Sequence, residues 1–127
     1  AYAIKAALNE ANIDAEAISF VASGANGNPV TDKLEALAIK KAIGTKTPVT
    51  AYKAFIGECY GASGAMTAIC ALSDMKNNKI SGINSQYQTI DDIPLVFGQQ
   101  NKESNYALVT SFSSEGNCSA IILKNVN

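Results

Sequence analysis

Lys53 and Glu58 are the charged side chains of a short stretch whose pattern predicts an active-site turn. A run of small residues, Gly61-Ala62-Ser63-Gly64-Ala65, follows this pair and predicts a helix that begins close to the turn. The chain contains no histidine among its 127 residues. Imidazole is the side chain that most often shuttles a proton near neutral pH, so this chain has none to offer for such chemistry.

The candidate nucleophiles are explained better by packing than by catalysis. Cys59 follows an anionic neighbour and has no histidine to activate it, so nothing in the sequence favours its thiolate form. Cys70 falls on an apolar helical stretch and Cys118 at a turn-to-strand boundary, and we expect both to be packed. Ser63 does not meet the nucleophile-elbow pattern, which needs a glycine two residues away on each side and a histidine partner.

The spacing of the three cysteines gives no sign of a metal site or of a disulfide framework. They therefore indicate reduced thiols. The sequence predicts neither a metal nor a cofactor.

The composition suits one domain, or half of a larger one, with part of its surface covered by other protein. Apolar residues make up 47% of the chain, which suffices for a core, whereas charged residues make up only 17%. The first residue is Ala1 rather than methionine, and we expect a fragment or a processed piece.

Charge and hydropathy argue against a nucleic-acid or a membrane partner. The net charge is −1, and the ten basic residues are all lysines scattered along the chain. Without arginine there is no bidentate fork for phosphate groups. The chain has no apolar run of the ~20 residues that a membrane-spanning helix needs, and it shows no signal peptide, so we expect a cytoplasmic location.

Helices alternate with short strands in the first part of the chain. Residues 2–11 repeat apolar side chains on one helical face, and Asn12 can end that helix in the left-handed conformation. Strands are expected at residues 18–21 and 48–51. Residues 62–76 predict a helix that is apolar on nearly all sides, which indicates burial on more than one side.

A further helix is expected between the two strands. Asp32 is its predicted N-cap, with Glu35 three residues on as a capping-box partner, and Gly44 ends it. We interpret Asp32 and Glu35 as capping residues rather than as paired carboxylates for hydrolysis. The predicted buried stripe of this helix consists of Leu34, Leu37, Ala38 and Ala42.

The last part of the chain changes character. Residues 80–100 are polar and predict an irregular segment, with a short extended piece at 94–97. Strands are expected at residues 106–110 and 119–123, joined by a turn at 113–117 so that they run antiparallel. The order helix, strand, helix, strand, helix and strand pair predicts an α/β fold with a mixed sheet layered with helices.

Three stretches together carry the motifs of one family. They are Phe20-Val21-Ala22-Ser23-Gly24 followed by Pro29, Asp32 and Glu35; Lys53-x-x-x-Gly57-Glu58 followed by the small-residue run; and Ser111-Phe112-Ser113-Ser114-Glu115-Gly116-Asn117. In this order and at about these separations they resemble the C-terminal half of a β-ketoacyl synthase, which has the thiolase fold. The resemblance extends from about Ile4 to Leu123 and implies that residues 1–127 form one such half.

The resemblance also marks where residues of the active members are missing. In the family, two histidines donate hydrogen bonds to the negative charge that develops during decarboxylative condensation. Their positions fall at Ser23 or Gly24 and at Glu58 in this sequence. An ionised glutamate accepts hydrogen bonds and repels an oxyanion. The resemblance therefore implies a degenerate site at Ser23, Lys53 and Glu58 with no catalytic residue, and we expect Lys53 and Glu58 to form an internal ion pair.

Other matched positions take their roles from the same resemblance. The glycine-rich gating loop of active members corresponds here to Ser113, Ser114, Glu115 and Gly116. Pro29, Asp32 and Glu35 match the family pattern and are expected to be structural. The cysteine nucleophile of the family lies in the other half, which this sequence does not contain.

The pattern is most similar to the chain length factors, the ketosynthase β subunits of type II polyketide synthases. The similarity implies a non-condensing subunit that forms a heterodimer with an active ketosynthase and shapes the acyl tunnel between them. It also implies docking of an acyl carrier protein, and packing against the N-terminal half of the same fold.

Two other readings of the sequence stay open. One is a divergent but active β-ketoacyl-acyl carrier protein synthase that condenses with an unusual residue set and a cysteine from its other half. The other is a small, independent binding module with no link to polyketides. Acylation of the full protein would favour the first, and folding of this segment alone as a monomer would favour the second.

Overall fold

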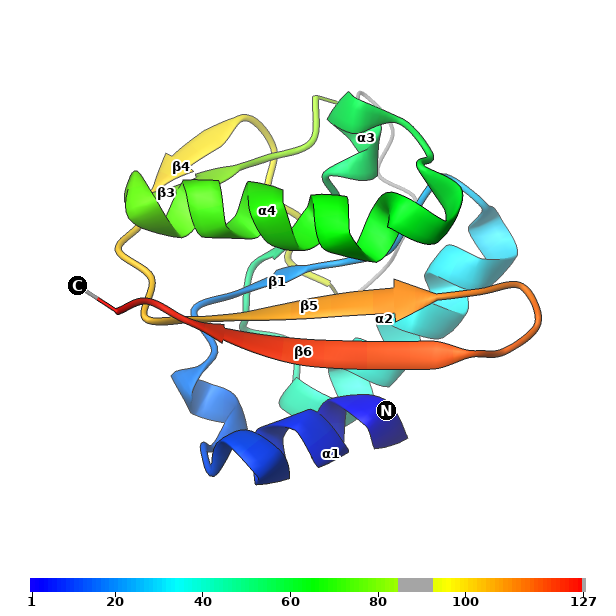
Figure 1. Ribbon diagram of the computed structural model, residues 1–127, viewed down its shortest axis with the longest axis horizontal. Helices are drawn as coiled ribbons and strands as arrows, with labels where there is room; N and C mark the ends of the chain where they lie inside the picture. The colour runs from blue at the N-terminus through cyan, green and yellow to red at the C-terminus, as the bar shows by residue number, and fades with distance from the viewer. Residues whose placement is uncertain (85–92, 127) are drawn as a thin grey trace.

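The computed structural model describes residues 1–84 and 93–126, which form a layered α/β unit (Figure 1). The element order agrees with the sequence prediction and adds short elements to it. The helices are α1 (Tyr2–Ala11), α2 (Pro29–Ile43), α3 (Lys53–Ile56) and α4 (Ser63–Lys76), with single 3₁₀ turns at Ala15–Ala17 and Tyr60–Ala62. The strands are β1 (Phe20–Ala22), β2 (Val49–Thr50), β3 (Lys79–Ser81), β4 (Gln99–Asn101), β5 (Tyr106–Phe112) and β6 (Cys118–Lys124).

The main sheet is mixed, as the element order predicted. Its strand order is β2-β1-β5-β6, with β1 parallel to both β2 and β5 and with β6 antiparallel to β5. The predicted hairpin is confirmed, and its register pairs Tyr106 with Lys124 and Phe112 with Cys118. The chain therefore closes the sheet with a hairpin after two parallel crossovers.

Both faces of the sheet are covered, and the period-two alternation of its strands divides the core into two clusters. Val21 and Leu108 point into a cluster with residues of α1 and α2, whereas Phe20 and Val109 point into a cluster with residues of α4. Figure 1 shows α4 on one side of the sheet and α1 on the other. All four of these strand residues are at most 3% exposed, as expected for strands covered on both faces.

Helix α1 matches its predicted bounds and its predicted end. Asn12 has φ 52° and ψ 48°, the left-handed conformation that lets its backbone N–H reach the carbonyls of the last turn. Ile4 and Leu8, one turn apart, are its buried residues.

Two predictions for α2 are wrong. The N-cap is Asn28, whose side chain accepts hydrogen bonds from the N–H groups of Val30 and Thr31, and Asp32 lies in the first turn instead. The buried residues are Glu35, Ala36 and Ile39, whereas Leu34 and Leu37 are 52% and 54% exposed. The buried stripe differs from the prediction because the carboxyl group of Glu35 bonds to Gly24 and Thr110. These bonds turn the Leu34 and Leu37 side of the helix outward. Gly44 ends the helix as predicted.

The segment predicted as irregular contains more structure than expected. Strands β3 and β4 pair antiparallel, with Ile80 opposite Gln100. The predicted extended piece is confirmed: Val49 N donates to Pro94 O at 2.9 Å and Val96 N to Val49 O at 2.9 Å, so this piece continues the sheet beyond β2. The middle of the segment, residues 85–92, lies outside the described residues.

A buried polar network fixes α4 to this segment. Asp74 accepts a hydrogen bond from the Tyr52 hydroxyl at 2.7 Å and bonds from Ser81 N and Ser81 Oγ at 2.6 and 3.0 Å. Burial and the adjacent carboxylate raise the pKa of Tyr52, so its hydroxyl stays a donor. The network joins Tyr52, the residue before α3, to α4 and β3.

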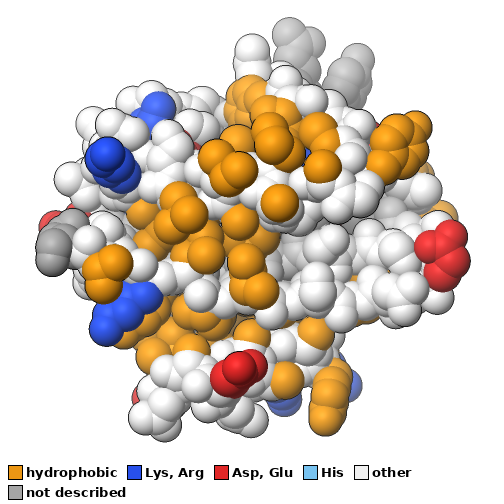
Figure 2. All heavy atoms as spheres, in the orientation of Figure 1, with side chains coloured by type: hydrophobic (Ala, Val, Ile, Leu, Met, Phe, Trp, Pro, Cys, Tyr) orange, Lys and Arg blue, Asp and Glu red, His pale blue; other side chains and the backbone are white. Residues whose placement is uncertain are grey.

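The outward face of α4 is apolar and exposed in this chain. Met66, Ile69 and Leu72 are 36%, 59% and 47% exposed, and Figure 2 shows apolar side chains gathered over this part of the surface. The inward face of α4 is buried. The sequence predicted burial on more than one side, and within this chain only one side is buried.

The three cysteines differ in their burial. Cys59 and Cys70 are half-buried, whereas Cys118 is exposed on the edge strand β6, contrary to the packing expected for it. Across residues 1–84 and 93–126, no helix combines the length and apolar character needed to cross a bilayer.

Replacing Gly82 by alanine should destabilise the fold. A Cβ atom there would lie 2.1 Å from the carbonyl oxygen of Gly98 and 2.6 Å from Val96, both on a neighbouring segment. We expect a loss of about 1–3 kcal/mol in the free energy of unfolding, as for other overpacked sites. Chemical denaturation measures it. Gly61→Ala is the matched control, because its Cβ would meet nothing within 4 Å, and an equal loss in both variants would contradict the close approach of the two segments at Gly82.

Candidate functional site

The candidate site lies at the edge of the sheet where the parallel strands end. Strands β1, β2 and β5 are parallel, so their carboxyl ends meet at one edge, which is where ligands and reactive groups usually lie in such sheets. The loop 23–28 follows β1, and the stretch 51–62 follows β2. The sheet therefore brings Ser23, Lys53 and Glu58 to the same edge.

A one-turn helix and a glycine position the charged pair. Lys53 begins α3, and Gly57 ends it with φ 76° and ψ 179°, a conformation open mainly to glycine. The chain then reverses so that Glu58 lies back against Lys53. The Lys53 ammonium and Glu58 Oε2 are 2.9 Å apart, and the Lys53 side chain is only 8% exposed. The predicted ion pair is confirmed.

The Glu58 carboxylate accepts hydrogen bonds from four donors. Oε2 accepts from the ammonium of Lys53 at 2.9 Å and from the amide Nδ2 of Asn26 at 3.0 Å. Oε1 accepts from the backbone N–H of Tyr60 at 3.0 Å and from the hydroxyl of Ser63. The carboxylate thus joins the loop after β1, the helix α3 and the first residue of α4.

These donors keep Glu58 ionised. The hydroxyl of Ser63, then the amide of Asn26 and the ammonium of Lys53, lower the pKa of Glu58 to about 2. The group carries no proton at physiological pH, and its oxygens are already engaged. It cannot donate a hydrogen bond to an oxyanion, which is what an imidazole or imidazolium N–H does at such a position.

Of the first two residues in the loop after β1, only Ser23 has room for a side chain. Ser23 is 3% exposed and its Oγ accepts from Ala25 N at 3.4 Å. At the next residue, Gly24, an added Cβ would lie 3.0 Å from the carbonyl oxygen of Thr110 and 3.3 Å from Cα of Ser111. A larger residue at position 24 would therefore displace β5, and Ser23 is the residue here that can carry a functional group.

Glu35 is buried and links three segments instead of capping the helix, which corrects the sequence prediction. Its Oε1 accepts from Gly24 N at 2.9 Å and from the Thr110 hydroxyl, so it joins α2 to the loop after β1 and to β5. Burial raises the pKa of Glu35, although both hydrogen bonds oppose this effect.

Asp32 and Pro29 hold the same loop from the start of α2. The carboxylate of Asp32 accepts from Asn26 N at 3.2 Å and from Gly27 N at 2.9 Å, so it organises the loop instead of capping the helix. Pro29 is the first helical residue, where its missing N–H is not needed. A purely structural role for both residues stays a prediction, and the bonds that Asp32 makes are not the capping bonds predicted for it.

The predicted gating loop forms the tight turn between β5 and β6. Ser113 N donates to Asn117 O at 2.9 Å, and Gly116 N donates to Ser113 O at 3.0 Å. Ser114 Oγ donates to the Glu115 carboxylate at 2.8 Å. The strand before the turn approaches the site through Ser111, which is 3.8 Å from the position of a Cβ on Gly64. A role of Ser113–Gly116 as a former gate stays a prediction.

Sequence reasoning missed Asn26, Asn28 and Ser63. For Asn28 a signal was present, since an asparagine directly before a proline is a favoured N-cap and first-turn pair. Ser63 was weighed only as a nucleophile or a helix residue, although it lies five positions from Glu58, and for Asn26 there was no signal. The bond from Asn26 to Glu58 spans 32 residues, and only the sheet topology makes it possible.

No metal site is visible in the described part of the chain. Among residues 1–84 and 93–126, no group of three or more histidine, cysteine, aspartate or glutamate side chains is placed to hold a metal ion.

Comparison with known proteins supports the same family as the motifs. Residues 1–85 match the family model for the C-terminal domain of β-ketoacyl synthases. The chain belongs to the β-ketoacyl synthase family. Its motifs and its mixed α/β architecture are those of the C-terminal half of this thiolase-fold family, as predicted.

Individual relatives match nearly all of this chain but about a third of their own length. A putative polyketide β-ketoacyl synthase 2 of Streptomyces cyaneus is 34% identical over 127 residues, which are 98% of this chain and 30% of that protein. The ishigamide ketosynthase/chain length factor structure superposes with a TM-score of 0.90 at 25% identity, covering 98% of this chain and 32% of the other. A ketosynthase in complex with its chain length factor from Xenorhabdus doucetiae gives a TM-score of 0.88, also at 25% identity, with the same coverage of 98% and 32%.

Removing the charge of Glu58 should weaken the fold at this edge. Glu58→Gln keeps the size of the side chain but directs an amide NH₂ toward groups that donate hydrogen bonds. We expect a loss of about 1–3 kcal/mol in the free energy of unfolding, the range for hydrogen bonds to charged groups. Lys53→Met and the double variant complete a cycle, measured by denaturation. A coupling energy near zero would contradict the ion pair, and Glu10→Gln on α1 is the control for loss of an exposed carboxylate.

Glu35 should make stability depend on pH in the opposite sense to an ordinary paired carboxylate. Its pKa is raised above 4.5 in the folded state, so its contribution is full below that value and is lost as the pH rises through the folded value. Glu35→Gln keeps an oxygen acceptor without a charge. Between about pH 5 and about pH 8, we expect the variant to lose less stability than the native chain. Denaturation midpoints at the two pH values test this, and equal slopes would refute it.

Proposed function

We propose that this chain is the C-terminal half of a non-condensing, ketosynthase-like subunit of the chain length factor type. In this proposal the subunit pairs with an active ketosynthase, and the two shape the tunnel that holds a growing polyketide chain. The observation that carries the proposal is the ionised Glu58, bound by four donors, at the position where active members of the family have a histidine.

The chemistry of condensation explains why this observation matters. Decarboxylation and carbon–carbon bond formation develop negative charge on an oxygen, and catalysis needs donors aimed at it. Removal of one such donor typically lowers the rate by ~10²–10³. A carboxylate at that place adds repulsion to the loss of the donor, and no histidine elsewhere in the chain can replace it.

The exposed face of α4 supports packing against the remaining part of the fold. Met66, Ile69 and Leu72 form an apolar strip on this helix (Figure 2), and contiguous apolar surface of this kind usually marks a protein interface. The chain spans about a third of the length of the relatives that it matches. We therefore assign this face to the N-terminal half of the same subunit.

The partner assignments rest on the resemblance to chain length factors. The structures similar to this chain include ketosynthases described together with chain length factors, which supports an active ketosynthase as the heterodimer partner. An acyl carrier protein would then deliver the extender units to that partner. The alternative, a divergent active synthase, would need donors from its other half to do the work that Glu58 cannot do.

Intact-mass measurement and a condensation assay together test the proposal. The full-length protein, incubated alone with acyl and malonyl thioesters of an acyl carrier protein, should gain no acyl adduct and make no product. With the active ketosynthase added, product should form, and its chain length should differ from that made by the ketosynthase alone. Condensation at an ordinary rate by the protein alone would overturn the proposal and favour the active enzyme.

A further inference from the structure

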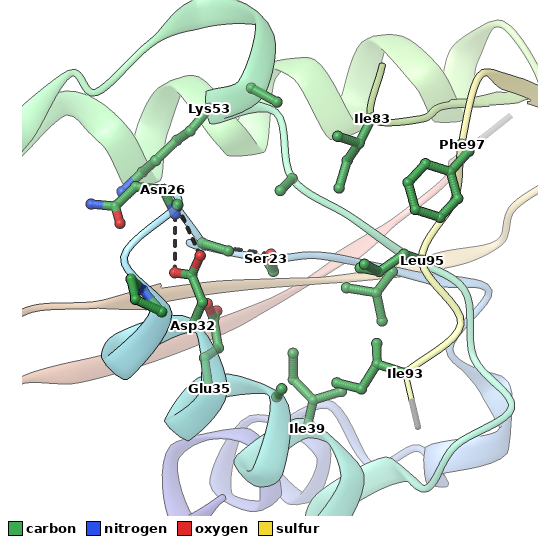
Figure 3. A pocket seen from close by; sticks show the side chains of 17 residues that line it. Ser23, Asn26, Asp32, Glu35, Ile39, Lys53, Ile83, Ile93, Leu95 and Phe97 are labelled. Carbon is green, nitrogen blue, oxygen red and sulfur yellow. Dashed lines mark hydrogen bonds between the residues drawn. The ribbon is translucent and has the colours of Figure 1, made fainter. Parts of the chain in front are cut away.

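A cavity of about 360 Å³ opens at the candidate site. It lies between α2, the carboxyl ends of β1 and β2, and the extended piece that follows residue 92 (Figure 3). Lys53 lines it and Glu58 does not. Its volume falls within the range of roughly 300–1,000 Å³ found for small-molecule sites, and at ~30 Å³ for each water-sized group it holds about twelve of them.

One end of the cavity is apolar. Figure 3 shows Ile83, Ile93, Leu95 and Phe97 along one side, with Ile39 of α2 below them. Ile39 and Ile93 are nearly buried, whereas Phe97 is 42% exposed and stands at the margin. This end suits the body of an aliphatic or aromatic molecule and offers it no polar partner.

The opposite end is polar and carries an excess of negative charge. Ser23, Asp32 and Glu35 lie there together with Lys53 (Figure 3). The positive charge of Lys53 is neutralised by Glu58 at 2.9 Å, whereas Asp32 bonds only to the backbone N–H groups of Asn26 and Gly27. Both hydrogen bonds of Glu35 are made by Oε1, and the residue lines the cavity, so Oε2 is the oxygen left for a ligand.

We propose that this cavity binds a small amphipathic molecule whose apolar body lies against Ile39 and Leu95 and whose head is a hydrogen-bond donor, an ammonium group above all. Donors on the ligand match the acceptors of Asp32 and Glu35, and an ammonium beside Glu35 favours the ionised form of this carboxyl group against the effect of burial. A carboxylate or phosphate head would face two acidic side chains and a lysine already engaged by Glu58.

Three probes of equal length test the head-group preference. Hexylamine, hexanamide and hexanoate share the apolar body and differ in charge and donor capacity. Titrated into the full-length protein near neutral pH and followed by calorimetry, hexylamine in its ammonium form should bind about tenfold or more tightly than hexanoate, since one pair of charge-assisted hydrogen bonds gives a difference of that order. Hexanamide should lie between them.

A pair of alanine-to-leucine variants tests the place of binding. Ala54 lines the mouth of the cavity and is exposed, so Ala54→Leu takes up ligand space with little effect on folding. It should weaken hexylamine binding about tenfold or more. Ala6→Leu, on the exposed side of α1, is the control and should bind as the native chain does.

The proposal stands if hexylamine binds more tightly than hexanoate and Ala54→Leu alone loses that binding. It is overturned if hexanoate binds as well as hexylamine, if the two leucine variants behave alike, or if none of the probes binds at millimolar concentration. None of these outcomes depends on whether the protein condenses acyl groups, so failure here leaves the proposed function untouched.

Discussion

The structure of the candidate site depends on one carboxylate that satisfies donors from three separate segments. Glu58 accepts hydrogen bonds from the amide of Asn26 in the loop after β1, the ammonium of Lys53 in α3 and the hydroxyl of Ser63 in α4. Glu58 therefore binds together the segments that surround the candidate site.

Two glutamates at this edge show how environment sets the behaviour of one residue type. Glu58 has donors on both oxygens and 32% of its side chain exposed, and its pKa falls to about 2. Glu35 lies on the buried side of α2. Desolvation is therefore the largest effect on its pKa and raises it despite two hydrogen bonds. The first is an anion at every physiological pH. The second can fold as a neutral acid, and it links α2 to β5 through Thr110.

The sequence predicted those features that local patterns determine. The bounds of α1, its left-handed end at Asn12 and the antiparallel hairpin of β5 and β6 follow from periodicity and turn residues, and all are present. The Lys53–Glu58 pair was also expected, because the two residues lie in one motif only five positions apart. Local information was sufficient in each of these cases.

The errors arose where tertiary contacts override local patterns. The leucines of α2 have helical spacing, yet the helix turns Ala36 and Ile39 inward because Glu35 is bound by Gly24 and Thr110. Pairing of β3 with β4 joins residues about twenty positions apart, farther than a tight hairpin turn can span. In both cases the deciding partner lies far along the chain, so no window of neighbouring residues contains the information.

The same reasoning limits what a single reversal at position 58 can achieve. A histidine there would supply a donor for an oxyanion, but it would leave Asn26, Lys53 and Ser63 without the acceptor that now joins them. A buried lysine that loses its counter-ion is costly, since the Lys53 side chain is only 8% exposed. A donor for an oxyanion at position 58 would thus need compensating changes at several of these positions together, because all three donors now share one carboxylate.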